Sequence, residues 1–173
     1  MAASGQSKMK VRARRFYFRF HPVPIPKSYR RPRAFIRIVG IMTDGQEQSS
    51  IREPLVVVVV DDDESVRESL PDLLKEFGFT VLAFSSADEF LASKSLDRTT
   101  CLVLDMVMPG MSGLDLQAAL RNRGRKIPII FITAQKDESI RKRVLDQGAV
   151  DVLLKPFSDT ALRKALSKAM GED

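Results

Sequence analysis

Short apolar runs, each followed at once by a polar group, restrict the fold of this chain more than any other feature of its sequence. Four of them are Val56–Val60, Leu102–Leu104, Ile129–Ile132 and Val150–Leu154. Runs of this length and composition are typical of strands that are buried on both faces of a parallel sheet. Helical patterns separate the runs, and this alternation predicts an α/β fold with helices on both faces of the sheet.

The polar groups that follow the runs are expected to meet, because the carboxyl ends of parallel strands lie at one edge of the sheet. Ligands bind at that edge in this architecture. The groups are Asp61, Asp62, Asp63, Asp105, Thr133 and Lys155. Each alone has a simpler explanation, since an Asp commonly starts a turn and a strand-end Thr or Lys can be satisfied by backbone or solvent. Together they predict a site that combines carboxylates, a hydroxyl and an ammonium group.

Four motifs carry a resemblance to a known family. They are Val59-Val60-Asp61-Asp62-Asp63, Asp105-Met-Val-Met-Pro-Gly-Met-Ser-Gly113, Thr133-Ala134 and Lys155-Pro156-Phe157. From about Leu55 to Met170 the chain resembles the receiver domain of response regulators in bacterial two-component signalling, and it is most similar to receivers of the nitrogen-fixation regulator type. The resemblance implies a flavodoxin-like (βα)5 three-layer sandwich whose five parallel strands have the order 2-1-3-4-5.

The resemblance also implies a phosphorylation site that requires a divalent cation. Asp105 is expected to be the phosphoacceptor. Mg²⁺ is expected to bind Asp61, Asp62, Asp105 and the backbone carbonyl of Val107, because both reactants of a phosphoryl transfer to a carboxylate are anionic. Asp62 would bind the metal directly and Asp61 largely through water. Asp63 is more simply explained as the cap of the following helix.

Further positions are expected to respond to the phosphoryl group. Lys155 would pair with Asp105 at rest and with a phosphoryl oxygen afterwards, and Pro156 would follow a cis peptide bond that directs the lysine inward. Thr133 would hydrogen-bond the phosphoryl group and move towards it, while the small Ala134 leaves room for the phosphodonor. This movement would change the surface of the fourth helix, fifth strand and fifth helix.

Three positions set how this chain would differ from other receivers. The family usually has an aromatic residue three positions before the lysine, which rotates inward with the threonine. This chain has Val152 there, so its switch is expected to be weaker or to rely on loop and helix shifts. Val107 and Gln135 flank the expected phosphoryl position and together offer one amide to hold an attacking water. Slow hydrolysis of the phosphoryl group is therefore predicted.

The basic charge of the chain lies almost entirely in its first 54 residues. These hold 12 Lys and Arg against 3 Asp and Glu, whereas residues 55–173 hold 16 against 19. The chain is therefore divided into a basic, Pro- and Arg-rich extension over 1–54, expected to be disordered, and a receiver domain over 55–173. Three interpretations of the extension stay open: an arm for nucleic acid, a transit peptide, or a non-native segment before a natural start at Met42.

The function implied by the resemblance is that of a stand-alone response regulator in a phosphorelay, since no pattern of an output domain follows the last helix. It would accept the phosphoryl group from a histidine kinase or a phosphotransfer protein and act on a downstream protein target. As an enzyme it would catalyse only its own phosphorylation and dephosphorylation. The alternative is a phosphorylation-controlled regulator that binds nucleic acid through residues 1–41.

Composition adds few further limits. A single cysteine excludes an internal disulfide. No apolar run approaches the roughly 20 residues that span a bilayer, so a cytoplasmic protein without a membrane partner is expected. Homodimerisation through the fourth and fifth helices is common among receivers, and no residue of this sequence decides it.

Overall fold

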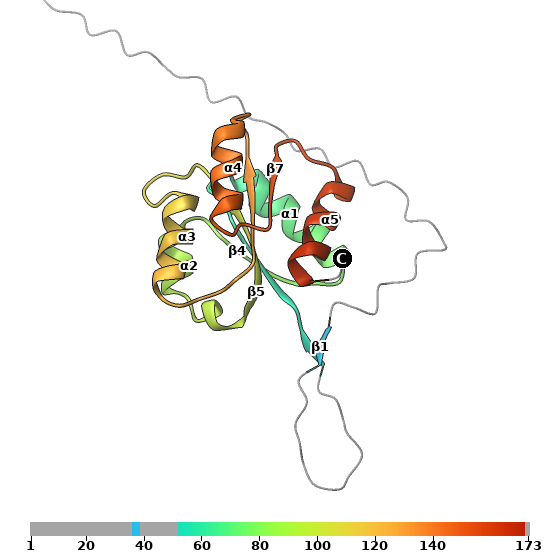
Figure 1. The fold of residues 1–173 in the computed structure, drawn as a ribbon. Coiled ribbons are helices and arrows are strands. Elements are labelled where there is room, and N and C mark those ends of the chain that lie inside the picture. The colour runs from blue at the N-terminus through green and yellow to red at the C-terminus, as the bar shows by residue number, and fades with distance from the viewer. Residues whose placement is uncertain (1–35, 39–51, 172–173) are drawn as a thin grey trace, which may run out of the picture.

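A five-stranded sheet lies at the centre of the computed structural model, which describes residues 36–38 and 52–171 (Figure 1). Its strands are β3 (Val56–Val60), β4 (Thr80–Phe84), β5 (Thr99–Asp105), β6 (Ile129–Thr133) and β7 (Asp151–Leu154). They stand in the order β4-β3-β5-β6-β7, and each neighbouring pair is parallel. If the strands of this sheet are numbered along the chain, with β3 as the first, the order is the predicted 2-1-3-4-5. The flavodoxin-like fold is therefore confirmed.

Helices cover both faces of this sheet in the described part of the chain. They are α1 (Glu64–Glu76), α2 (Ala87–Ala92), α3 (Gly113–Asn122), α4 (Glu138–Asp146) and α5 (Asp159–Met170). Figure 1 shows α1 and α5 on one side of the sheet and the other three on the opposite side. The molecule is therefore the predicted three-layer sandwich, with one apolar core under each helix layer.

The five valines of β3 show why polar and apolar residues do not alternate along this strand. Val57 and Val59 pack in the core under α1 and α5, whereas Val56, Val58 and Val60 pack in the core on the other face. Successive side chains of a strand point to opposite faces, and both faces of β3 are covered, so all five valines are buried. A polar residue at any of these positions would be buried without water.

Side-chain caps fix the beginnings of the helices that follow the polar groups. Asp63 accepts a hydrogen bond from the backbone N–H of Ser65 at the start of α1, as predicted. Ser112 and Asp115 form a capping box at the start of α3, and Ser158 caps α5. Each such cap contributes about 1 kcal/mol. The caps of α1 and α3 also end the loops that carry the acidic residues, which limits how these loops can move.

Two segments add short elements to this sandwich. After α2 ends at Ala92, a 3-10 helix, η1 (Lys94–Arg98), leads directly into β5. Before the sheet, β1 (Ile36–Ile38) and β2 (Arg52–Pro54) pair as a two-stranded antiparallel ribbon inside the segment that was expected to lack regular structure. Strands of three residues are too short to show an alternating pattern. The interpretations of residues 1–35 and 39–51, including the start at Met42, lie outside the described residues.

Cys101 packs as a small apolar residue in the core. It is fully buried in β5, and burial raises the pKa of its thiol to about 12. As for membranes, no helix in the described ranges has the length and apolar character required to cross one.

Candidate functional site

Three aspartates meet at the carboxyl edge of the sheet. β3 and β5 are neighbouring strands whose register sets Val60 opposite Leu104, so the residue that follows the first and the residue that follows the second lie side by side. These residues are Asp61 and Asp105. Together with Asp62 they offer one carboxylate oxygen each, and these oxygens all lie within 4.8 Å of one another. The fold thus brings together the acids that the sequence analysis selected.

Asp61 is the most deeply buried member of this acidic cluster and has no exposed surface. One of its carboxylate oxygens accepts a hydrogen bond of 2.9 Å from the backbone N–H of Asp63, and the other accepts one of 2.6 Å from the Lys155 ammonium. Burial raises the pKa of Asp61, although the charge and hydrogen bond of Lys155 lower it. Both oxygens have donors from the protein, so the orientation of this carboxylate is fixed.

Asp105 carries a negative charge that the fold compensates poorly. Its side chain is only 12% exposed, and its carboxylate lies 3.5 Å from the ammonium of Lys155. Burial raises the pKa of Asp105 to about 6; the attraction of Lys155 opposes this rise, and repulsion from Asp61 adds to it. A buried carboxyl group with a perturbed pKa beside specific charges is a common mark of a functional site.

Lys155 reaches the acidic cluster from the end of β7 and contacts two of its members. The expected ion pair with Asp105 is present at 3.5 Å, and a shorter contact of 2.6 Å, a hydrogen bond, goes to Asp61. Asp61 is the more completely buried carboxylate, and a buried charge that lacks a hydrogen-bonded partner is the more costly one. The backbone N–H of Lys155 donates to the carbonyl of Thr133 at 2.7 Å, and the Lys155–Pro156 peptide bond is cis.

The charges at this edge fit a divalent cation. Three carboxylates face one ammonium group, and burial raises the pKa of two of the carboxylates. Asp62, by contrast, is exposed, so one side of the acidic cluster is open to water. Mg²⁺ prefers oxygen ligands, takes about six of them and usually keeps several waters. The donor atoms and the partial exposure therefore suit magnesium.

The backbone after β5 lies tightly against the start of α3. The Met106 N–H donates to the carbonyl of Ile132 at 3.0 Å, and the Gly113 N–H donates to the carbonyl of Met106 at 3.2 Å. Gly113 leaves no space for a side chain, because a Cβ there would lie 2.3 Å from the carbonyl oxygen of Asp105. The backbone of Val107 hydrogen-bonds the Asp105 carboxylate, and its side chain is 54% exposed.

The residues expected to respond to a phosphoryl group lie at the ends of β6 and β7. Thr133 is buried at the end of β6, and its hydroxyl oxygen accepts a hydrogen bond of 3.1 Å from the backbone N–H of Gln135. Ala134 and Gln135 are exposed in the loop that follows. Val152 is 5% exposed and packs in the core on the α4 face. It therefore has no exposed position from which it could rotate inward.

Arg67 belongs to this site, and the sequence analysis missed it. Its guanidinium donates a hydrogen bond of 2.8 Å to the backbone carbonyl of Asp61. Arg67 is the fourth residue of α1, and helix side chains lean towards the N-terminus of their helix, so it reaches back over the loop that carries the acids. The sequence contained one signal for this contact: an arginine stands one turn into the helix that follows the acidic run.

Comparisons with known proteins point to one family. A family model for the response regulator receiver domain matches residues 57–167. Nodulation protein W of Bradyrhizobium diazoefficiens is 48% identical over 118 residues, which cover 68% of this chain and 52% of that protein. The structure of response regulator StyR is 44% identical with a TM-score of 0.64, covering 69% of this chain and 60% of that one.

A solved structure of FixJ-N agrees over nearly its whole length. It is 36% identical to this chain, with a TM-score of 0.62, and the match covers 70% of this chain and 97% of that one. The full-length relatives are longer, and the chain spans about half the length of the curated relatives that it matches.

Proposed function

The chain belongs to the response regulator receiver domain family, and we propose that it accepts a phosphoryl group on Asp105 and thereby switches its contacts with other proteins. One observation carries this proposal: three carboxylates and a partly buried ammonium group converge at the carboxyl edge of the sheet. The phosphodonor in this proposal is a histidine kinase or a phosphotransfer protein, and the recipient of the signal is a downstream protein.

In the proposed reaction a carboxylate oxygen of Asp105 attacks the phosphorus atom of a phosphohistidine on the donor protein. A P–O bond to Asp105 forms while the P–N bond breaks, and the released imidazole takes up a proton. The attacking carboxyl group must be ionised. With a pKa of about 6 before any metal binds, most Asp105 side chains are ionised at neutral pH.

The acidic cluster is proposed to hold Mg²⁺ through Asp62, Asp105 and the backbone carbonyl of Val107. Asp61, whose two oxygens already have donors from the protein, would contribute largely through water. When bound, the ion would screen the negative charges of the carboxylate and the incoming phosphoryl group. Exposure of Asp62 leaves room for the waters that Mg²⁺ keeps.

Lys155 and Thr133 are proposed to stabilise the phosphorylated state. The ammonium of Lys155 is 3.5 Å from Asp105, so a small movement lets it pair with a phosphoryl oxygen. The hydroxyl of Thr133 would turn to the same group, and the small, exposed Ala134 leaves the approach open. Because Val152 is buried, the movement of Thr133 would be passed on by the β6–α4 loop and by α4.

The phosphoryl group is proposed to persist. Val107, whose backbone N–H hydrogen-bonds the Asp105 carboxylate, has an exposed apolar side chain, and an apolar group cannot hold the water that hydrolyses an acyl phosphate. Gln135 is exposed in the β6–α4 loop and offers one amide. We therefore expect slow dephosphorylation of the isolated protein.

Intact-mass spectrometry tests the proposal. The protein is incubated with Mg²⁺ and acetyl phosphate, with Asp72→Asn as the control because Asp72 is an exposed acid on α1. Wild type and Asp72→Asn should each gain one phosphoryl mass, whereas Asp105→Asn, or wild type in EDTA, should not. A folded wild-type protein that gains no mass, or an Asp105→Asn protein that gains it, would overturn the proposal.

A further inference from the structure

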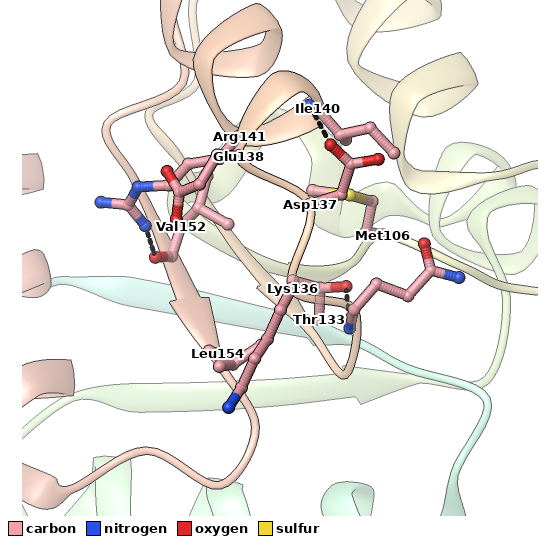
Figure 2. A pocket seen from close by; sticks show the side chains of 10 residues that line it. Met106, Thr133, Lys136, Asp137, Glu138, Ile140, Arg141, Val152 and Leu154 are labelled. Atoms are coloured by element: carbon pink, nitrogen blue, oxygen red, sulfur yellow. Dashed lines mark hydrogen bonds between the residues drawn. The ribbon is translucent and has the colours of Figure 1, made fainter.

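A pocket lined in part by Thr133 contains no residue of the acidic cluster and not Lys155. It lies between the β6–α4 loop, α4 and β7 and has a volume of about 200 Å³. Its apolar wall consists of Met106, Ile140, Val152 and Leu154, and Thr133 completes it (Figure 2). Figure 2 shows these side chains arranged around one space, with Ile140 entering from α4 and Val152 from β7. We call this space the α4 pocket.

The size and lining of the α4 pocket suit a single aromatic ring. An engineered apolar cavity of about 150 Å³ in another protein binds benzene, so about 200 Å³ holds a ring with a small substituent. Met106 contributes a thioether, which makes favourable contacts with aromatic rings. Ile140, Val152 and Leu154 add branched aliphatic surface.

The charged residues around the α4 pocket favour a neutral ligand. Arg141 lies 3.4 Å from Asp151 in an ion pair, and Asp137 caps α4 by accepting backbone hydrogen bonds. The two other charged residues of the lining, Lys136 and Glu138, are exposed and opposite in sign. The mouth of the pocket therefore has no net charge that would select an anion or a cation.

Thr133 is the hydroxyl-bearing residue of the lining. Its hydroxyl oxygen accepts a hydrogen bond from the backbone N–H of Gln135, and among the described residues no acceptor holds the hydroxyl proton. We propose that the α4 pocket binds a neutral, single-ring aromatic alcohol whose oxygen accepts this proton, and that this ligand opposes phosphorylation. The proposed effect of the ligand on phosphorylation rests on the proposed function, in which the same Thr133 hydroxyl turns to the phosphoryl group. One proton cannot serve both acceptors, so each ligand weakens the binding of the other by the same factor.

Binding to the pocket is tested first, without phosphorylation, so that its result does not depend on the proposed function. The probe is p-cresol, followed by methyl NMR on the unphosphorylated protein. Saturable shifts of the Met106, Ile140, Val152 and Leu154 methyl groups support the proposal. Absence of saturable shifts, or shifts centred on another surface, would overturn it.

Two phenylalanine substitutions provide the matched pair. Ile140→Phe fills the pocket from α4 and should weaken p-cresol binding at least about ten-fold, the effect expected from blocking an apolar site. Leu82→Phe adds the same ring at an exposed position on β4 and should leave the affinity unchanged. Equal p-cresol affinity in both variants, with both folded by circular dichroism, would overturn the proposal. If Ile140→Phe does not fold, the methyl shifts of wild type alone decide whether p-cresol binds in the α4 pocket.

Competition is tested with Mg²⁺ and beryllofluoride, a stable mimic of the phosphoryl group. Beryllofluoride should weaken p-cresol binding about five-fold, as expected for one lost hydrogen bond, and should leave toluene, which lacks the hydroxyl, unaffected. If p-cresol binds equally or more tightly in the presence of beryllofluoride, the ligand does not oppose phosphorylation. Failure of beryllofluoride to bind at all would instead count against the proposed function, and the opposition would fall with it. A last probe, N-acetyltyrosinamide, represents a tyrosine side chain of a protein. If it binds as tightly as p-cresol, the proposal of a small-molecule ligand is overturned in favour of a tyrosine from a protein.

Discussion

Replacing Asp105 by Asn is expected to stabilise the metal-free protein at neutral pH, although it removes the proposed phosphoacceptor. Burial raises the pKa of Asp105 from 3.8 to about 6. Below pH 3.8 the carboxyl group is protonated in the folded and unfolded chains alike. As the pH rises from about 4 to about 6, the unfolded chain releases its proton and the folded chain retains it, so the fold loses stability. At pH 7 this loss is complete.

The size of the effect follows from the two pKa values. One pH unit corresponds to about 1.4 kcal/mol, so ionised Asp105 costs the fold about 3 kcal/mol at pH 7. Asn has nearly the same shape and no charge. The attraction of Lys155 is already included in the pKa, and that lysine keeps its hydrogen bond to Asp61. We therefore expect Asp105→Asn to raise the free energy of unfolding by about 2–3 kcal/mol.

Urea unfolding in EDTA at pH 7 and at pH 4 measures this difference. Asp72→Asn is the control because the side chain of Asp72 is 75% exposed, and it should change the free energy of unfolding by less than about 0.5 kcal/mol. At pH 4 the gain from Asp105→Asn should fall below about 1 kcal/mol. Mg²⁺ should stabilise wild type more than the variant, because the proposed metal site needs this carboxylate.

A variant that is no more stable than wild type at pH 7 would refute the reasoning. So would a gain that is equally large at pH 4, because it would come from packing and not from ionisation.

Three other changes test the loops around the acidic cluster. Gly113→Ala should lower the free energy of unfolding by about 3 kcal/mol, because its Cβ would meet the Asp105 carbonyl oxygen at 2.3 Å; wild-type stability in urea would show that α3 shifts freely. Val107→Asn should speed the loss of the phosphoryl group by giving the attacking water an amide, and an unchanged decay of the phosphorylated mass would contradict this. Arg67→Met, which removes the 2.8 Å hydrogen bond to the Asp61 carbonyl, should weaken Mg²⁺ binding about five-fold; calorimetric titration with unchanged affinity would exclude this role for Arg67.

Four of the five strands of the sheet, and their ends, were predictable because each of these four carries its own local signal. The valines of β3 are buried on both faces, and that double burial is what an uninterrupted apolar run records. Where such a run stops, the following residue lies at the sheet edge, which is how Asp61 and Asp105 could be placed together. The order of the strands needed more than periodicity, and it came from the resemblance of the motifs to a known family.

The contacts within the site were less predictable because they depend on distances between side chains. The sequence indicates that Lys155 reaches the acids, but whether it binds Asp61 or Asp105 depends on which carboxylate is more buried. The reach of Arg67 back to a backbone carbonyl leaves only a weak trace in the sequence. The α4 pocket behind Thr133 is formed by the β6–α4 loop, α4 and β7 together, and no single motif records its volume.

The central claim is that Asp105, and no other acid of the cluster, receives the phosphoryl group. Borohydride reduces an aspartyl phosphate to homoserine, which peptide mass spectrometry can locate. After incubation with Mg²⁺ and acetyl phosphate, followed by borohydride, we expect homoserine at position 105 alone. Homoserine at position 61 or 62, or none anywhere in a protein that has gained the phosphoryl mass, would contradict the claim.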